Sequence, residues 1–135
     1  MIYLPDTNVR IALLRGRDLG LVARWRAVNA GDMVPSSVVI YELRYGTEHG
    51  AQPAREHRRL DEFPEPLASL PFDNACARKC AEIRHRLARN RTLIGPHDLQ
   101  IAATALCHGL TLVTHNTMEF SRIPDLRLED WESNA

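Results

Sequence analysis

Short apolar runs alternate with longer helix-forming stretches along most of the chain, and this alternation restricts the possible folds more than any other feature. The run at residues 110–114 is the clearest strand, and Gly109 separates it from a helical stretch. The segments that join these runs show little of the tight-turn chemistry that makes β-hairpins. Strands that are separated by helices form parallel sheets covered on both faces. The sequence therefore predicts an α/β fold around a mainly parallel central sheet.

Caps and hydrophobic periodicity give approximate bounds for the elements. Thr7 or Asn8 is the expected cap of the first helix, and Gly16 is expected to end it. We expect strands at residues 2–4, 33–35, 67–70, 110–114 and 126–128. We expect helices at 7–16, 18–28, 36–46, 52–63, 73–90 and 97–108, with a short turn or helix at 117–120. Because 135 residues suffice for one hydrophobic core, residues 1–135 are predicted to form a single domain.

Composition excludes several classes of protein. Lys and Arg total 17 and Asp and Glu total 17, and this zero formal net charge argues against a protein that coats nucleic acid by charge alone. No apolar run has the length of a membrane span or the form of a secretory signal, so we expect a cytoplasmic protein. Cys76 and Cys80 lie one helical turn apart, which would suit a metal site or a disulfide. The expectation for these two and for Cys107 is free thiols.

Three carboxylates stand at positions that a structural role explains poorly. Asp6 follows the first predicted strand, at the edge where open α/β sheets bind ligands. Glu42 falls on the predicted buried stripe of its helix, and Asp98 shares a helix face with Ile101. A carboxylate buried without a partner is strongly unfavourable, so each of these acids needs compensation.

Each acid also has a simpler explanation. Asp6 could be a helix cap, Arg44 could pair with Glu42, and the helix dipole would favour Asp98 in a first turn. A divalent cation explains all three together, because carboxylate oxygens are the ligands that Mg²⁺ and Mn²⁺ prefer. Such a site can activate water for attack on a phosphodiester, and one or two metal ions are compatible with the sequence.

Four blocks in the same order closely resemble the VapC family of PIN-domain toxins. They are DTN at 6–8, YELRYG at 41–46, IGPHDLQIAA at 94–103 and LVTHNTMEF at 112–120, followed by DLRLEDW at 125–131. The resemblance implies a PIN α/β/α sandwich with Mg²⁺- or Mn²⁺-dependent endoribonuclease activity on structured RNA, often tRNA. It also implies a VapB-like antitoxin that covers the active site, homodimers, and larger assemblies that bind operator DNA through the antitoxin.

The resemblance also assigns roles by position. Asp6, Glu42 and Asp98 match the family's acidic triad and are the expected metal ligands. Asn116 stands where many PIN domains have an aspartate, so Glu119 is expected to supply or position the missing carboxylate. The block that contains these two residues makes initiator tRNA the first candidate substrate.

Supporting residues are expected around the acids. Thr7 and Thr114 are expected to hydrogen-bond a metal-bound water or a neighbouring acid, with strand-end capping as the alternative. His97 and His115 flank site residues and are expected at the surface. The expected RNA-binding residues are Arg10 at the cleft rim and Arg86, Arg89 and Arg91 in a basic run, with a solvated helix face as the alternative for the run.

Two other classes of function remain open from the sequence. One is a PIN-fold binding module with weak or absent catalysis, which Asn116 favours and the intact acids oppose. The other is a phosphatase or phosphotransferase, which would share acid-plus-Mg²⁺ chemistry. The chain lacks the Asp-x-Asp pair and the glycine-rich phosphate loop that such enzymes use, since Asn8 follows Thr7.

Overall fold

A three-stranded parallel sheet lies at the centre of the computed structural model, which describes residues 1–62 and 69–132. The strands are β1 (Tyr3–Pro5), β2 (Thr111–Val113) and β3 (Leu128–Glu129), in the order β1-β2-β3. Leu112 of β2 pairs with Leu4 on one side and with Leu128 on the other. The predicted parallel pairing is therefore confirmed, and both crossovers from β1 to β2 and from β2 to β3 contain helices.

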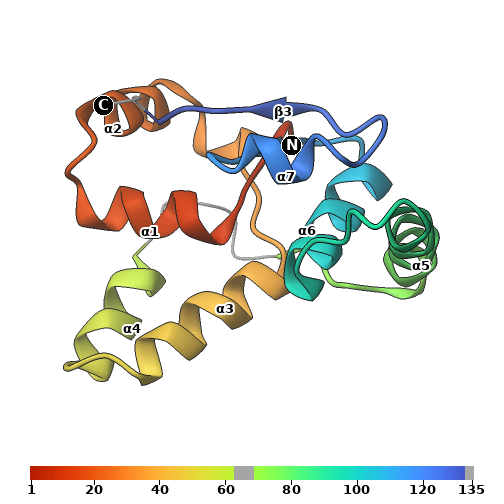
Figure 1. Ribbon diagram of the computed structural model, residues 1–135. Helices are drawn as coiled ribbons and strands as arrows, with labels where there is room; N and C mark the ends of the chain where they lie inside the picture. Colours follow the sequence, from red (N-terminus) through yellow and green to blue (C-terminus); the bar gives the residue numbers. More distant parts are fainter. Residues whose placement is uncertain (63–68, 133–135) are drawn as a thin grey trace.

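Helices form most of the described chain. They are α1 (Thr7–Arg15), α2 (Leu19–Ala27), α3 (Ser37–Glu48), α4 (Pro53–Asp61), α5 (Asn74–Arg89), α6 (Pro96–Cys107) and α7 (Thr117–Phe120), with a 3-10 turn, η1 (Ala30–Asp32). Figure 1 shows α1 and α2 on one side of the sheet, α5 and α6 on the other, and α3 and α4 projecting below. Within the described ranges, no helix has the length and apolar character needed to cross a membrane.

Two hydrophobic cores lie on opposite faces of the sheet. Leu4 and Leu112 belong to a core shared with α3, α5 and α6. Tyr3 and Val113 belong to a second core shared with α1 and α2. This division follows from the geometry of a strand, because successive side chains point to opposite faces. The α/β/α sandwich that the sequence predicted is confirmed.

Several predicted elements differ from the structure. Asp6, and not Thr7 or Asn8, caps α1, since its backbone is extended while Thr7 is already helical. The strand expected at 33–35 is reduced to one parallel bridge between Met33 and Tyr3, and Pro35 has no N–H with which to continue a ladder. The last strand lies at Leu128–Glu129, slightly beyond the predicted 126–128.

The segment after α4 is only partly described. The expected strand at 67–70 falls mostly on residues outside the described ranges, and Leu70 forms a single parallel bridge with Ser36. The predicted end of the preceding helix at 63 lies outside them too, and α4 ends at Asp61. All three cysteines are free thiols, as predicted.

Candidate active site

Asp6 lies where β1 ends and α1 begins, and hydrogen bonds fix it on both elements. Its backbone N–H donates to the Val113 carbonyl oxygen at 2.9 Å, and its Oδ1 accepts the Val9 N–H at 2.9 Å. The Thr114 hydroxyl is a further partner of the carboxylate. Asp6 is only 5% exposed, and this burial, helped by the charge of Glu42, raises its pKa above the ordinary value. The capping role that we considered as an alternative is therefore real, but capping does not explain the neighbouring acid.

Glu42 projects from α3 between two side chains from other elements. The Thr7 hydroxyl donates to Glu42 Oε1 at 2.5 Å, and His97 Nδ1 lies 3.3 Å from Glu42 Oε2. The side chain is 26% exposed, so the prediction that it lies on a buried stripe is only partly correct. The alternative partner Arg44 instead donates to Asp61 at 2.5 Å. Glu42 is thus held by contacts that cross the fold rather than by an arginine of its own helix.

Asp98 lies half-buried in the first turn of α6. Burial is the largest of the causes that raise the pKa of Asp98 from 3.8 to about 6. The negative charges of Glu42, Asp6 and Glu119 add to this upward shift in pKa, and His97 opposes it. These electrostatic interactions mean that carboxylates from the end of β1, from α3, from α6 and from α7 lie close to one another.

The fourth carboxylate belongs to Glu119, and it is held by Asn116, the residue that departs from the family pattern. Asn116 Nδ2 donates to Glu119 Oε2 at 2.7 Å, across the N-terminal turn of α7. The backbone N–H of Asn116 donates to the Thr114 hydroxyl at 3.0 Å, which ties this turn to the end of β2. Asn116 and Glu119 therefore act as a pair, in which the amide holds a carboxylate whose charge acts on Asp98.

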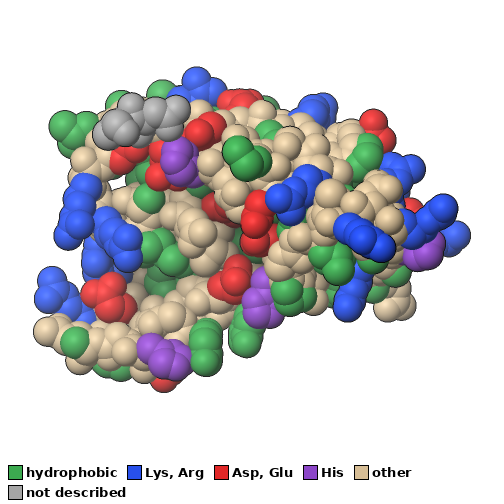
Figure 2. Space-filling model, in the orientation of Figure 1, with side chains coloured by type: hydrophobic (Ala, Val, Ile, Leu, Met, Phe, Trp, Pro, Cys, Tyr) green, Lys and Arg blue, Asp and Glu red, His purple; other side chains and the backbone are tan. Residues whose placement is uncertain are grey.

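This concentration of negative charge suits a divalent cation. Asp6, Glu42 and Asp98 offer oxygen ligands of the kind that Mg²⁺ and Mn²⁺ prefer. Carboxylates that share a site repel one another, and one of them takes up a proton unless a cation neutralises the group. Burial is the first cause of the raised pKa of Asp98, and this repulsion adds to it. The residues present therefore fit a hard divalent metal ion, and Figure 2 shows acidic side chains gathered near the centre of this face.

Two open pockets adjoin the acids on either side of α1. One, of about 420 Å³, is lined by Asp6 and Asn116 and also by His115 and Glu132. The other, of about 350 Å³, lies between α1, α3 and α4, and Glu42 lies on its wall beside apolar side chains. The site is thus open to a ligand larger than a metal ion.

Sequence reasoning missed an acidic group near the C-terminal end. His115 Nδ1 lies 3.0 Å from Asp130 Oδ2, and with Glu132 these residues bring ligand atoms within 4.8 Å of one another. His115 is exposed as predicted, with 52% of its side chain accessible, whereas His97 is partly buried, with 44% of its side chain accessible, and each contacts a carboxylate. The available signal for Asp130 was its place in the block at 125–131.

Arg10 does not lie at the cleft rim, so this prediction is wrong. The residue is 2% exposed, and its guanidinium lies 5.4 Å from the ring centre of Trp25 in the core beneath α1. A side chain so fully enclosed has no surface to offer to an RNA phosphate. Its charge acts instead on the interior, where it lowers the pKa of Asp6 against the larger effect of burial.

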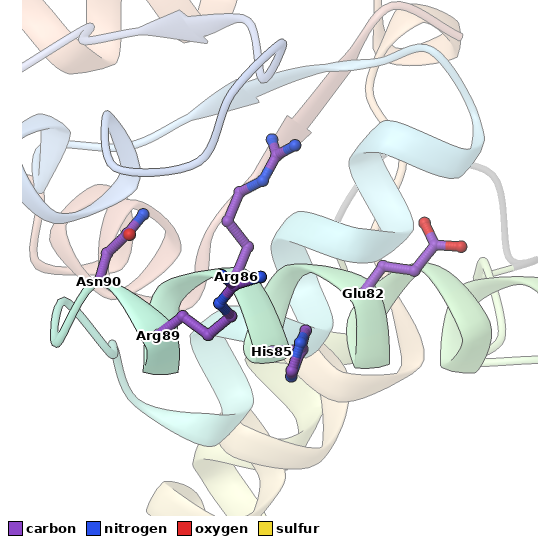
Figure 3. Close-up of a pocket in the computed structure, with 5 residues that line it drawn as sticks. All are labelled: Glu82, His85, Arg86, Arg89 and Asn90. Atoms are coloured by element: carbon purple, nitrogen blue, oxygen red, sulfur yellow. The ribbon is translucent and has the colours of Figure 1, made fainter.

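The arginines of the basic run are exposed on and after α5. Arg86 and Arg89 line a pocket of about 550 Å³ with Glu82, His85 and Asn90, and Figure 3 shows these side chains projecting from the helix. Arg91 follows in a left-handed conformation and is exposed as well. Because α5 packs chiefly on α6, an RNA strand would have to extend beyond α6 to reach this surface from the acids.

The fold and the acidic cluster suit a nuclease that uses a divalent metal, and comparison with known proteins identifies the family. The PIN domain family model matches residues 3–126. PIN nucleases generally use a divalent metal, which agrees with the donor set described above. A "tRNA(fMet)-specific endonuclease VapC" of Shigella flexneri is 37% identical over 96% of this chain and 97% of its own length. "Ribonuclease VapC2" of Haemophilus influenzae is 36% identical over the same shares.

Solved structures agree with these relatives. The DNA-bound VapBC of Salmonella typhimurium matches with a TM-score of 0.89 and 36% identity, over 97% of this chain and 98% of that one. VapBC2 of Rickettsia felis, bound to a fragment of promoter DNA, matches with a TM-score of 0.88 and 32% identity, over 98% of this chain and 100% of that one. The chain belongs to the VapC ribonucleases of the PIN-domain family.

Proposed function

We propose that this chain is a toxin endoribonuclease that hydrolyses phosphodiester bonds in tRNA with Mg²⁺ or Mn²⁺. The observation that carries the proposal is the meeting of Asp6, Glu42, Asp98 and Glu119 from four separate elements, with the pKa of Asp98 raised to about 6. Neighbouring acids with shifted pKa values are typical of a functional site. The likeness of the chain to VapC ribonucleases over nearly its whole length gives independent support.

The division of labour follows from the contacts of each side chain. Asp6, Glu42 and Asp98 would hold the metal, which when bound supplies an activated water and neutralises charge on the leaving oxygen. The Thr7 hydroxyl orients Glu42, and the Thr114 hydroxyl orients Asp6. These hydrogen bonds fix the direction of the ligand oxygens, and their loss typically weakens a metal site.

Asn116 orients Glu119, and this pair bears on the alternative of a binding module without catalysis. That alternative rested on the neutral amide of Asn116. Because the amide donates to Glu119 at 2.7 Å, a carboxylate is retained beside the other acids, which weighs against the loss of catalysis. A phosphatase has no support from the family to which the chain belongs.

The proposed substrate is initiator tRNA. Its support is the name of the Shigella relative and the family resemblance of the block at 112–120. An activity on tRNA would fit the cytoplasm, where tRNA is found, and this is the location that we propose. Arg86, Arg89 and Arg91 are proposed to contact phosphates of the more distant part of the RNA, since all three are exposed.

The proposed partner is a VapB-like antitoxin, and operator DNA would be bound through it. The support is that the two matching structures described above are both VapBC complexes bound to DNA. The pocket between α1, α3 and α4 has an apolar wall with Leu14, Leu43 and Leu60, next to Glu42. A partner segment in this pocket would block access to the acids.

Cleavage of total tRNA by the antitoxin-free protein tests the proposal. We expect discrete fragments with Mg²⁺ or Mn²⁺ that disappear with EDTA and in the variant Asp98→Asn. Sequencing of the fragment ends identifies the substrate. Folded protein that binds Mn²⁺ yet leaves every tRNA intact would contradict the proposal.

A further inference from the structure

A carboxylate holds His115 by one edge of its ring. This histidine lies two residues after β2, and its Nδ1 is 3.0 Å from Asp130 Oδ2 and 3.3 Å from Asp130 Oδ1. The backbone N–H of Glu132 donates to Asp130 Oδ1 at 3.0 Å, so the carboxylate is itself fixed. These contacts orient a side chain that is exposed and is not part of the hydrophobic cores.

The same carboxylate determines which nitrogen of His115 carries the proton. An ionised carboxylate only accepts hydrogen bonds, so the neutral imidazole beside Asp130 has its proton on Nδ1. The Nε2 atom, on the other edge of the ring, then has a lone pair and can accept a hydrogen bond. Among residues 1–62 and 69–132, none forms a hydrogen bond with this Nε2. His115 therefore offers an oriented acceptor to a ligand.

His115 shares a pocket with one of the candidate metal ligands. The pocket of about 420 Å³ lies between α1 and the residues that follow β2 and β3, and Asp6, Arg15, His115, Asn116 and Glu132 line it. Its volume is typical of a small-ligand site, about 300–1000 Å³. Glu132 interacts with both sides of the pocket, because Asp6 raises its pKa and His115 lowers it. A nucleotide in this pocket would therefore have Asp6 and His115 beside it.

The charge around His115 favours a sugar over a phosphate. Asp130 and Glu132 are acids, and Figure 2 shows red and purple side chains together in the upper part of this face. Negative charges repel a phosphate group, whereas a hydroxyl group is neutral and can donate a hydrogen bond to an imidazole nitrogen. Arg15, on the wall of the pocket, offsets part of the negative charge. The pocket is thus better suited to the ribose of a nucleotide than to its phosphate.

We propose that Nε2 of His115 accepts a hydrogen bond from the 2′-hydroxyl of a ribose next to the scissile phosphate, and that this contact selects RNA over DNA. The inference rests on the proposed ribonuclease function and adds to it the group that recognises the sugar. Attack of a metal-activated water on phosphorus gives the 2′-hydroxyl no part in the reaction, so the chemistry alone would also hydrolyse DNA. A protein distinguishes RNA from DNA at a given site through the 2′-hydroxyl. Selection for RNA therefore requires a contact of the kind that His115 offers.

The test compares cleavage of two synthetic oligonucleotides that span the bond cut in tRNA. One contains only ribose, and the other has 2′-deoxynucleotides on both sides of the scissile phosphate. We expect the parent to cleave the first with a kcat/KM about 5- to 30-fold higher, as the loss of one hydrogen bond predicts. His115→Phe keeps a ring of similar size without its nitrogen atoms and should cleave both oligonucleotides equally well. His115→Gln, which can accept through its amide oxygen, should retain part of the preference.

Two further variants examine the orientation of the ring and the specificity of the effect. Asp130→Ala removes the carboxylate that fixes the ring and its proton, so the preference for ribose should decrease. His108→Phe, the same change at an exposed histidine after α6, is the matched control and should keep the preference of the parent. A parent without preference, or a full preference in His115→Phe or Asp130→Ala, would overturn the inference.

Metal binding is the competing explanation for the contacts of His115. Ligand atoms of His115, Asp130 and Glu132 lie within 4.8 Å of one another. Titration of the parent and of His115→Phe with Mn²⁺ distinguishes the two explanations, and we expect both proteins to bind the same number of ions. If the variant binds one ion fewer, the three residues form a metal site and the inference is wrong.

The outcomes also separate this inference from the proposed function. If the parent cleaves tRNA and His115→Phe keeps the full preference for ribose, the inference fails while the proposed function stands. If the parent cleaves no RNA, both are overturned.

Discussion

The Thr7 hydroxyl donates to Glu42 Oε1 at 2.5 Å, and this bond joins residues 35 positions apart in the chain. Thr7 is the first residue of α1, directly after Asp6, and Glu42 lies in the middle of α3. The bond therefore couples the direction of one candidate metal ligand to the helix that starts at another. It makes the geometry of the site depend on how α1 and α3 pack.

Thr7→Val should impair the site while leaving the fold nearly intact. Valine has the same shape but no hydroxyl, so Glu42 loses the hydrogen bond that orients it. Removal of such a supporting bond typically lowers metal affinity or activity about 10- to 100-fold. Mn²⁺ titration and tRNA cleavage measure the effect. Thr7→Ser, which keeps the hydroxyl, should retain most of both, and a defect as severe as that of valine would argue against this role.

Asp6→Asn should abolish cleavage without loss of the helix cap. Asparagine can accept the Val9 N–H as aspartate does, but it carries no negative charge. We expect a decrease in activity of about 1000-fold, because the metal and its charge stabilisation are lost together. Asp18→Asn, the same change at the cap of α2, is the matched control and should cleave normally. Normal cleavage by Asp6→Asn would refute the site assignment.

The stability of the metal-free protein should depend on pH through Asp98. Its pKa is raised to about 6, so the folded state binds this proton more tightly than the unfolded state does. The contribution of Asp98 is therefore unfavourable above pH 6 and vanishes below pH 3.8. Asp98→Asn should stabilise the protein at pH 8 more than at pH 4, by about 1 kcal/mol after allowance for solvent screening.

Urea unfolding in EDTA at both pH values measures this difference. Asp125→Asn, at an exposed position, is the control and should give the same change in unfolding free energy at pH 4 and pH 8. If Asp98→Asn changed the unfolding free energy equally at both pH values, the charged form of this carboxylate would not be unfavourable in the folded protein. Addition of Mg²⁺ should stabilise the parent more than Asp98→Asn, because the variant lacks one ligand.

Asn116→Asp should weaken the metal-free fold and strengthen metal binding. The amide that donates to Glu119 at 2.7 Å would be replaced by a second carboxylate, and the two charges would repel each other. A bound cation removes that repulsion, so the stabilisation by Mn²⁺ should be larger than in the parent. Thermal unfolding with EDTA and with Mn²⁺ checks both parts. Glu119→Gln should show the opposite pattern, and equal metal responses in all three proteins would exclude a role for this pair.

Arg10→Ala should act on stability and not on a surface contact with RNA. The side chain is 2% exposed and packs over Trp25, so its removal leaves a cavity and takes away a charge that acts on Asp6. We expect a loss of about 2–4 kcal/mol in the free energy of unfolding. Arg15→Ala, at an exposed position of the same helix, should lose much less. Chemical denaturation distinguishes the two, and equal stabilities would contradict the buried role.

Much of the fold could be predicted because its signals are short-range. Gly109, with its left-handed backbone, follows the end of α6, and β2 lies within the strand predicted at 110–114; this pattern needs no knowledge of the rest of the molecule. The prediction of a strand at 33–35 was wrong because strand pairing depends on long-range contacts. Its local sequence is apolar, but whether it pairs depends on Pro35 and on how Tyr3 approaches it from elsewhere.

The sequence by itself determined the succession of strands and helices and the acids that needed an explanation. Periodicity places a residue on one face of its own helix and marked Glu42 and Asp98 as unusual, and the end of a predicted strand marked Asp6. Only the tertiary structure decided which side chains share a volume, as in the contacts of Glu42 with Thr7 and His97. It also decided the burial of Arg10, since a charged residue is exposed or enclosed according to the helices packed around it. The relative orientation of helices is set by packing across the whole core, and no pattern within one helix contains that information.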